Sequence, residues 1–120
     1  MIYIRFYRKG TQGDVHMVMD GHAGAAPKGE DLICAAASML CYTAGQAVQF
    51  LWEQGKLKCR PKIQIREGRA VIIATPKKDT EAEVLYLFWV VQAGAWVLAR
   101  NYPRFVRTFP ISLEEKREEP

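Results

Sequence analysis

The chain has 120 residues, 49% of them hydrophobic and 25% charged, with a formal net charge of +4 at pH 7. This is the length and composition of one globular domain, too short for two cores. Three cysteines without a regular spacing argue against a disulfide framework. The N-terminus alternates apolar and polar residues and does not have the pattern of a signal peptide. We therefore expect a cytoplasmic protein.

Two strands are predicted at the N-terminus. Residues 2–8 alternate between apolar side chains on one face and polar or aromatic ones on the other, which is the strand period. A second alternating run covers residues 15–20, and the segment 9–14 between the two reads as a hairpin loop. Gly21 then allows the backbone to turn out of the sheet just before His22.

A long helix is predicted from about Asp31 to Gln54, followed by Gly55 as a C-terminal cap residue. Alanine-rich positions at helical spacing indicate its buried stripe, and they suggest close approach to another backbone. The stripe is expected to contain Ile33, Ala36, Ala37, Leu40, Ala44, Ala47 and Leu51.

A β-hairpin with Gly68 at its tip, a second helix capped by Asp79 or Thr80, and a last strand are expected in the second half. The expected bounds are 62–66 and 69–75 for the hairpin strands, about 80–101 for the helix and 105–109 for the last strand. The order ββαββαβ predicts an α+β fold, with a small antiparallel or mixed sheet packed against two long helices. We assign residues 1–112 to one domain and 113–120 to a charged, disordered tail.

Both predicted helices contain long uncharged runs, at 32–52 and 84–99. The first is long enough to span a bilayer, but its alanines and polar residues favour a buried helix on a sheet, so we expect no membrane contact. The second helix is apolar on two sides, and we expect a homodimer to cover the side that the first helix leaves open. The two sides are Leu85, Phe88, Trp89, Gln92, Trp96 and Leu87, Val90, Val91, Gly94, Leu98.

Cys34 and His22 are candidates for a thiol nucleophile and its base. With Asp31 as N-cap, Cys34 is the third helical residue, where free amides and the helix dipole favour a thiolate. The alternatives are a cysteine that only packs in the core and a loop histidine bound to a backbone carbonyl. Asp31 either caps the helix alone or also orients the His22 ring.

The sequence says less about the roles of three further residues. Ser38, one turn beyond Cys34, either hydrogen-bonds near the site or bonds back to the Cys34 carbonyl. Cys41 lies two turns from Cys34, about 10 Å along the axis, which is too far for a disulfide, so core packing is its better account. Cys59 is read as incidental. A zinc site would need ligands from separated elements, so we expect no metal and no cofactor.

The segment Gly21-His22-Ala23, followed by Gly29 and Asp31 and then by Cys34-Ala35-Ala36 and Ser38, resembles the signature of the ribosomal-processing cysteine proteases, the Prp family of bacteria. The resemblance implies that Cys34 is the nucleophile and His22 its partner, with Asp31, Ser38, Gly21 and Ala35 in support. It also implies a substrate: the N-terminal extension of a large-subunit ribosomal protein (L-twenty-seven), cut next to aromatic residues.

The sequence thus predicts a cysteine endopeptidase in which backbone amides, such as those of Cys34 and Ala35, stabilise the oxyanion. We expect a ribosomal protein precursor as partner, an association with ribosomes, and no specific nucleic acid. One alternative is a prophage-type protease that processes a capsid or scaffold protein. Another is a non-catalytic ribosome-associated or RNA-contacting module. It is supported by the positive charge and by basic residues around the hairpin, namely Lys58, Arg60, Lys62, Arg66 and Arg69.

Overall fold

The computed structural model describes residues 1–10, 13–24, 26–27 and 31–111. The predicted α+β class and the order ββαββαβ are confirmed. The expected tail, 113–120, lies outside the described residues. The elements are β1 (Ile2–Lys9), β2 (Asp14–Gly21), α1 (Leu32–Glu53), β3 (Lys62–Arg66), β4 (Arg69–Ala74), α2 (Glu81–Asn101) and β5 (Val106–Phe109).

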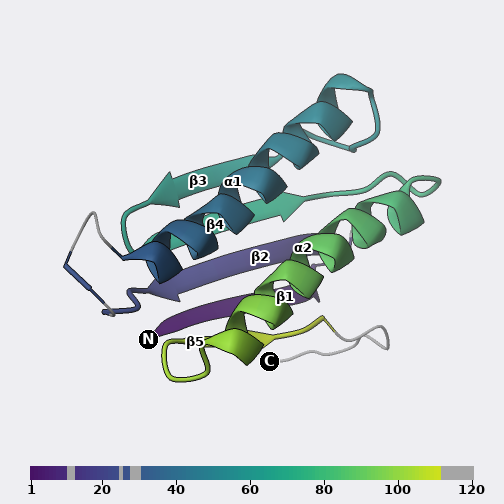
Figure 1. Ribbon diagram of the computed structural model, residues 1–120. Helices are drawn as coiled ribbons and strands as arrows, with labels where there is room; N and C mark the ends of the chain where they lie inside the picture. The colour runs from purple at the N-terminus through teal and green to yellow at the C-terminus, as the bar shows by residue number, and fades with distance from the viewer. Residues whose placement is uncertain (11–12, 25, 28–30, 112–120) are drawn as a thin grey trace.

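The five strands form one mixed sheet in the order β3-β4-β2-β1-β5. β1 pairs antiparallel with β2 and parallel with β5, and the remaining pairs are antiparallel. Both helices lie side by side on the same face of this sheet (Figure 1). The opposite face carries neither helix, so the described part of the fold has two layers.

The core lies between the sheet and the helices, because alternate strand residues point toward the helical layer. Ile4 of β1, Met17 of β2 and Ile72 of β4 are completely buried, and they meet Val48 of α1 and Phe88 of α2 in the same hydrophobic cluster. In β1 the buried residues alternate with exposed ones over its first five positions, as the sequence predicts.

The buried face of α1 differs from the predicted stripe. Ala36 is exposed, and Leu40 and Ala47 are only half-buried. The helix instead buries a face on which small residues allow it to approach the sheet closely. A Cβ at Gly45 would lie 3.0 Å from Cγ2 of Ile63 in β3, which sets the rotation of the helix. The buried residues of α1 are Ile33, Ala37, Cys41, Ala44, Gly45, Val48 and Leu51.

The fold buries only part of each of the two predicted sides of α2. On the side that includes Gly94, Val91 is buried and a Cβ at Gly94 would touch Leu40 of α1, but Val90 is exposed. On the other side Phe88 and Gln92 are buried, whereas Trp89 and Trp96 are about half exposed. An apolar outer helical surface remains, made of Met39, Tyr42 and Phe50 of α1 and Tyr86, Trp89, Val90, Trp96 and Val97 of α2.

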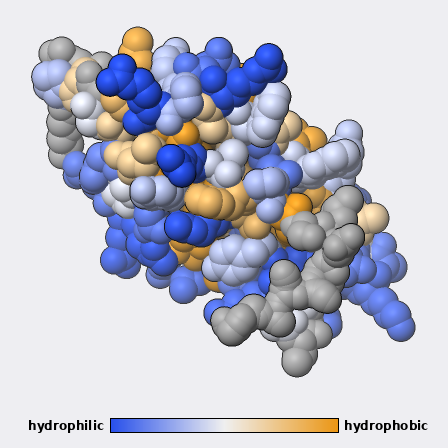
Figure 2. All heavy atoms as spheres, turned by 90° about the horizontal axis from the view of Figure 1, so that it is seen from below, coloured by the Kyte–Doolittle hydropathy of each residue, from blue (hydrophilic) through white to orange (hydrophobic). Residues whose placement is uncertain are grey.

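Both helices are long and apolar enough, by length and composition, to cross a membrane. Core helices of soluble proteins pass the same test, and here each helix contributes completely buried residues to the core. Seen from below, apolar residues surface in the middle of the molecule with hydrophilic residues around them (Figure 2).

Candidate active site

The predicted site residues lie at the end of the sheet where β2 stops, the β3–β4 hairpin turns and α1 begins (Figure 1). Gly21 ends β2 with φ 102°, a conformation that favours glycine. Its N–H donates to the carbonyl of Gly68 at 2.9 Å, which ties the end of β2 to the hairpin tip. The amino group of Met1 donates to the carbonyl of His22. The chain is therefore held on both sides of the point where it leaves the sheet.

Cys34 lies in the first turn of α1, as predicted. Asp31 is the N-cap: its backbone is extended, and Oδ1 accepts the N–H groups of Ile33 and Cys34, each at 3.0 Å. The half-buried Sγ of Cys34 accepts the N–H of Ala23 at 3.3 Å. The loop that follows β2 is thus anchored on this thiol.

The exposed His22 ring lies against the tip of the hairpin, since a Cβ at Gly68 would be 2.8 Å from Nε2. Within the described residues, no hydrogen bond joins the imidazole to Sγ of Cys34. In this structure the backbone N–H that follows His22 lies at the thiol, whereas the His22 ring lies at Gly68. The pairing of Cys34 and His22 as a catalytic dyad stays a prediction.

The remaining predicted residues are placed around this thiol. The N–H of Ala35 donates to the Asp31 carbonyl at 3.1 Å, so both amides suggested as oxyanion donors, those of Cys34 and Ala35, are already bonded to Asp31. The half-buried Ser38 hydroxyl makes no hydrogen bond with the described residues, and a bond back to the Cys34 carbonyl is not among its contacts. Gly29 lies outside the described residues.

The amide of Ala23 was not predicted from the sequence. A backbone N–H has no sequence signal of its own, and only the position of Ala23 directly after His22 pointed to this segment. The contact places one polar donor directly on the sulfur, where it can stabilise negative charge.

The other two cysteines lie in different surroundings. Cys41 is completely buried, and its S–H donates to Sδ of Met19 at 3.6 Å. Burial raises the pKa of the Cys41 thiol to about 12, so it is a core residue, as predicted. Cys59 is exposed. Among the described residues, no group of three or more His, Cys, Asp and Glu side chains is placed to hold a metal ion.

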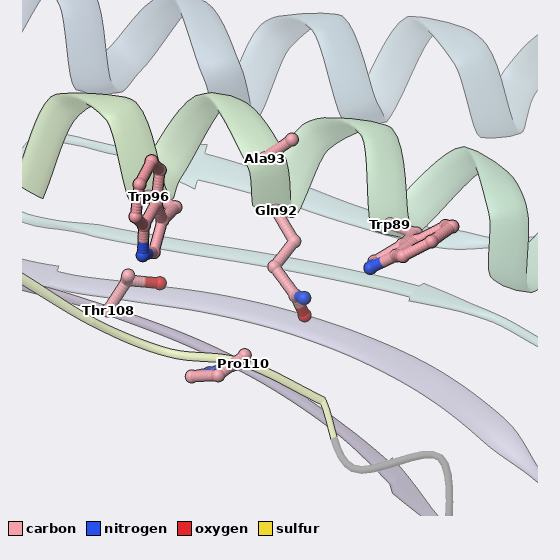
Figure 3. Close-up of a pocket in the computed structure, with 6 residues that line it drawn as sticks. All are labelled: Trp89, Gln92, Ala93, Trp96, Thr108 and Pro110. Carbon is pink, nitrogen blue, oxygen red and sulfur yellow. The ribbon is translucent and has the colours of Figure 1, made fainter.

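A hollow of about 230 Å³ lies between α2 and β5, lined by Trp89, Gln92, Ala93, Trp96, Thr108 and Pro110 (Figure 3). Both indole nitrogens point toward the strand side of the hollow. Oε1 of Gln92 accepts the N–H of Ile111 at 2.6 Å, which holds the segment after β5 under the helix. None of the predicted catalytic residues lines this hollow.

The family model described as cysteine protease Prp matches residues 1–107. Three solved structures share the fold. One is an essential ribosomal processing protease Prp from S. aureus with a covalently linked product peptide (TM-score 0.68, 22% identity, 93% of this chain and 100% of that chain). The same protease with a substrate peptide has a TM-score of 0.62 and 20% identity, again over 93% of this chain and 100% of that chain. SMU.848 from Streptococcus mutans has a TM-score of 0.63 and 27% identity over 92% of this chain and 93% of that chain. Among curated proteins, none matches.

Proposed function

We propose that this chain, which belongs to the Prp family of cysteine proteases, is an endopeptidase that removes the N-terminal extension of a large-subunit ribosomal protein (L-twenty-seven). One observation carries the proposal. Cys34 is held at a capped helix start with a backbone N–H directed at Sγ. A similar fold from S. aureus is described as a ribosomal processing protease with a covalently linked product peptide.

In the proposed reaction, Sγ of Cys34 attacks the peptide carbonyl carbon as a thiolate. The Ala23 N–H, which donates to Sγ in this structure, lies next to the carbon under attack and stabilises the negative charge that moves from sulfur to oxygen. His22 gives its proton to the leaving amine nitrogen as the C–N bond breaks. Water then adds to the thioester, and the thiol and the new carboxyl terminus are released. The groups that take part in this reaction thus come from two segments, the start of α1 with Cys34 and the loop after β2 with His22 and Ala23.

Because the His22 ring lies against Gly68 rather than on the thiol, the proposal includes a movement of this exposed side chain toward Cys34 when the peptide binds. The peptide group that follows His22 is fixed at both ends, because its carbonyl accepts from the Met1 amino group and its N–H donates to Sγ of Cys34, so we propose that the movement is a rotation of the side chain. Hydrogen bonds of catalytic residues often tighten only in the substrate complex.

The test is incubation of the purified protein with the extended ribosomal protein, followed by intact-mass measurement of the products. A single cut that removes the extension is expected. Cys34→Ala should abolish the cut and keep the fold, because a half-buried thiol leaves only a small cavity. The matched control is Cys59→Ala, which removes an exposed thiol and should cleave normally. Cleavage by the Cys34→Ala protein would rule out the cysteine mechanism.

We further propose that the protein works as a homodimer. The outer helical surface exposes eight large apolar side chains, and the hollow above β5 adds a concave site that a partner side chain can fill. This surface carries almost no charge, because the two runs 32–52 and 84–99 contain none. A second copy of the same surface is the simplest cover for it.

A further inference from the structure

We call the face of the sheet opposite the helices the open sheet face. It displays one set of side chains from all five strands. The pairing register places them in four rows across the strands, because paired residues share a face. Their order in the rows follows the sheet. The rows are Arg66, Arg69, Asp20, Tyr3, Arg107; then Gln64, Val71, Val18, Arg5, Phe109; then Lys62, Ile73, His16, Tyr7; then Asp14, Lys9.

The open sheet face is strongly basic. It carries six cationic side chains, Arg5, Lys9, Lys62, Arg66, Arg69 and Arg107, against the two carboxylates of Asp14 and Asp20. Both carboxylates already have partners: Asp14 accepts the Thr75 hydroxyl at 2.9 Å, and Asp20 pairs with Arg69 and, at 3.8 Å, with Arg5. The cations are spread from one edge strand to the other, so the positive potential covers the whole face. Such a surface attracts a polyanion.

Between these cations the face presents planar groups. Tyr3 and Phe109 are 36% and 43% exposed, and the Arg5 guanidinium lies over both rings, 5.4 Å and 5.0 Å from their centroids. Tyr7 stacks on His16 with 4.7 Å between ring centroids. Burial lowers the pKa of His16, and Lys9 and Lys62 act in the same direction against Asp14, so the stacked imidazole is neutral at pH 7. Aromatic rings and guanidinium planes on a sheet are the groups on which unpaired bases stack.

We propose that the open sheet face binds single-stranded RNA without sequence specificity. A second copy of this face is not the partner, because two faces with the same excess of cations repel each other. The cations alone would equally attract an acidic peptide, but a peptide would leave the exposed ring planes unused. A single strand supplies both phosphates for the cations and bases for the rings. The choice of RNA over DNA rests on the proposed function in ribosome maturation, where an RNA surface surrounds the substrate.

The first row of this face leads directly to the candidate active site. Arg69 and Arg66 flank the hairpin tip that carries Gly68, and Gly68 contacts the His22 ring. Asp20 directly precedes Gly21, and Tyr3 follows Met1 by two residues. Hydrogen bonds of Gly21 and Met1 hold the segment that contains His22. RNA bound along this row would therefore place the protease next to a protein terminus that emerges from an RNA surface.

The experiment measures fluorescence anisotropy of a labelled RNA of about 12 nucleotides with the full chain at several salt concentrations. The charge variant is Lys62→Glu with Arg107→Glu, on opposite edges of the face. The matched control is Lys77→Glu with Lys78→Glu, exposed lysines in the loop before α2. The stacking variant is Phe109→Leu, which keeps an apolar side chain. Thermal unfolding verifies that each variant is folded.

Binding that weakens with salt supports the proposal, together with a salt slope that falls by about 1.4 in the charge variant, or 0.7 per lost phosphate contact. Phe109→Leu should weaken binding by about fivefold or more, and the control should match the wild type. Three results overturn the proposal: no binding at about 50 mM salt, equal loss in the control, or equal affinity for duplex RNA or poly-glutamate.

Cleavage of a short peptide substrate is measured on the same samples. The charge and stacking variants should cleave the peptide at the wild-type rate, because these residues lie outside the proposed catalytic groups. A wild-type protein that binds RNA but cleaves no peptide refutes the proposed function alone. A protein that cleaves the peptide but binds no RNA refutes the inference drawn from the open sheet face.

Discussion

The thiol of Cys34 differs from the other two thiols of the chain in what surrounds it. It accepts a backbone N–H, whereas Cys41 is sealed in the core and Cys59 faces solvent without a comparable donor among the described residues. An exposed cysteine reacts with alkylating reagents simply because it is accessible. Reactivity therefore distinguishes Cys34 from Cys41 directly, and from Cys59 only after Cys59 is replaced.

In a Cys59→Ser protein, we expect iodoacetamide at about pH 7.5 to modify one thiol per folded chain, that of Cys34. Burial raises the pKa of Cys41 to about 12, so almost none of this thiol is ionised at this pH. Cys41 should react only after unfolding. Peptide mass mapping locates the label, and a Cys34→Ser, Cys59→Ser protein is the blank. Rapid modification of Cys41 in the folded protein would contradict this assignment.

At the scale of elements, the β3–β4 hairpin supports the candidate site from outside the signature segment. Gly68 at its tip has φ 79°, and its carbonyl accepts the N–H of Gly21. A Cβ on Gly68 would point at the His22 ring. Gly55 after α1 has a similar φ of 74°, but a Cβ there would meet nothing within 4 Å. The two glycines are therefore a matched pair for separating backbone strain from contact with His22.

We predict that Gly68→Ala and Gly55→Ala each lower the free energy of unfolding by about 1 kcal/mol, because both force alanine to a positive φ. Only Gly68→Ala also places a methyl group against Nε2 of His22. Because the proposed reaction moves this ring from Gly68 to Cys34, the methyl group crowds only the resting position, and kcat/KM should rise above that of Gly55→Ala, which cleaves normally. Peptide cleavage and urea unfolding measure the two effects. Equal activity of the two variants would show that the contact with Gly68 does not position His22.

Much of the element level could be predicted from the sequence, because its signals are local. Asp31 three residues before Cys34 indicates a capped helix start, and the structure confirms it. Ala36 was wrongly placed in the core, because the rotation of α1 depends on how closely Gly45 approaches Ile63, a contact between distant segments. The Ala23 amide and the Gly68 contact with His22 were missed for the same reason. Local patterns give the elements, whereas the groups around the thiol depend on tertiary packing.

On the scale of the whole molecule, the fold separates two kinds of surface. The outer helical surface is apolar and nearly uncharged, whereas the open sheet face is basic. Because the sheet lies between them, a dimer joined through the helices leaves both open sheet faces outside. The proposed self-association and the proposed RNA binding would therefore use opposite sides and would not compete.

We predict that the wild-type chain sediments as a dimer at micromolar concentration. Val90→Lys puts a charge on the outer helical surface, at a side chain that is 56% exposed in the single chain. It should weaken association by about tenfold or more, since an interface that buries an unpaired charge loses at least about 1.4 kcal/mol. The control Gln54→Lys adds the same charge at the exposed end of α1 and should remain dimeric. A wild-type mass of 13.6 kDa would refute the dimer.

The parallel pairing of β1 with β5 also sets an order of events during synthesis. The Thr108 hydroxyl donates to the carbonyl of Ile4 across 104 residues, so the first strand waits for nearly the whole chain before its outer edge is covered. At roughly 5–20 residues per second, that wait lasts about 5–20 seconds. During it, the β1–β2 hairpin has a free edge that can pair with other nascent chains. A chain interrupted before Val106 never closes that edge, and such fragments should be removed by aggregation or proteolysis rather than persist as partly active enzyme.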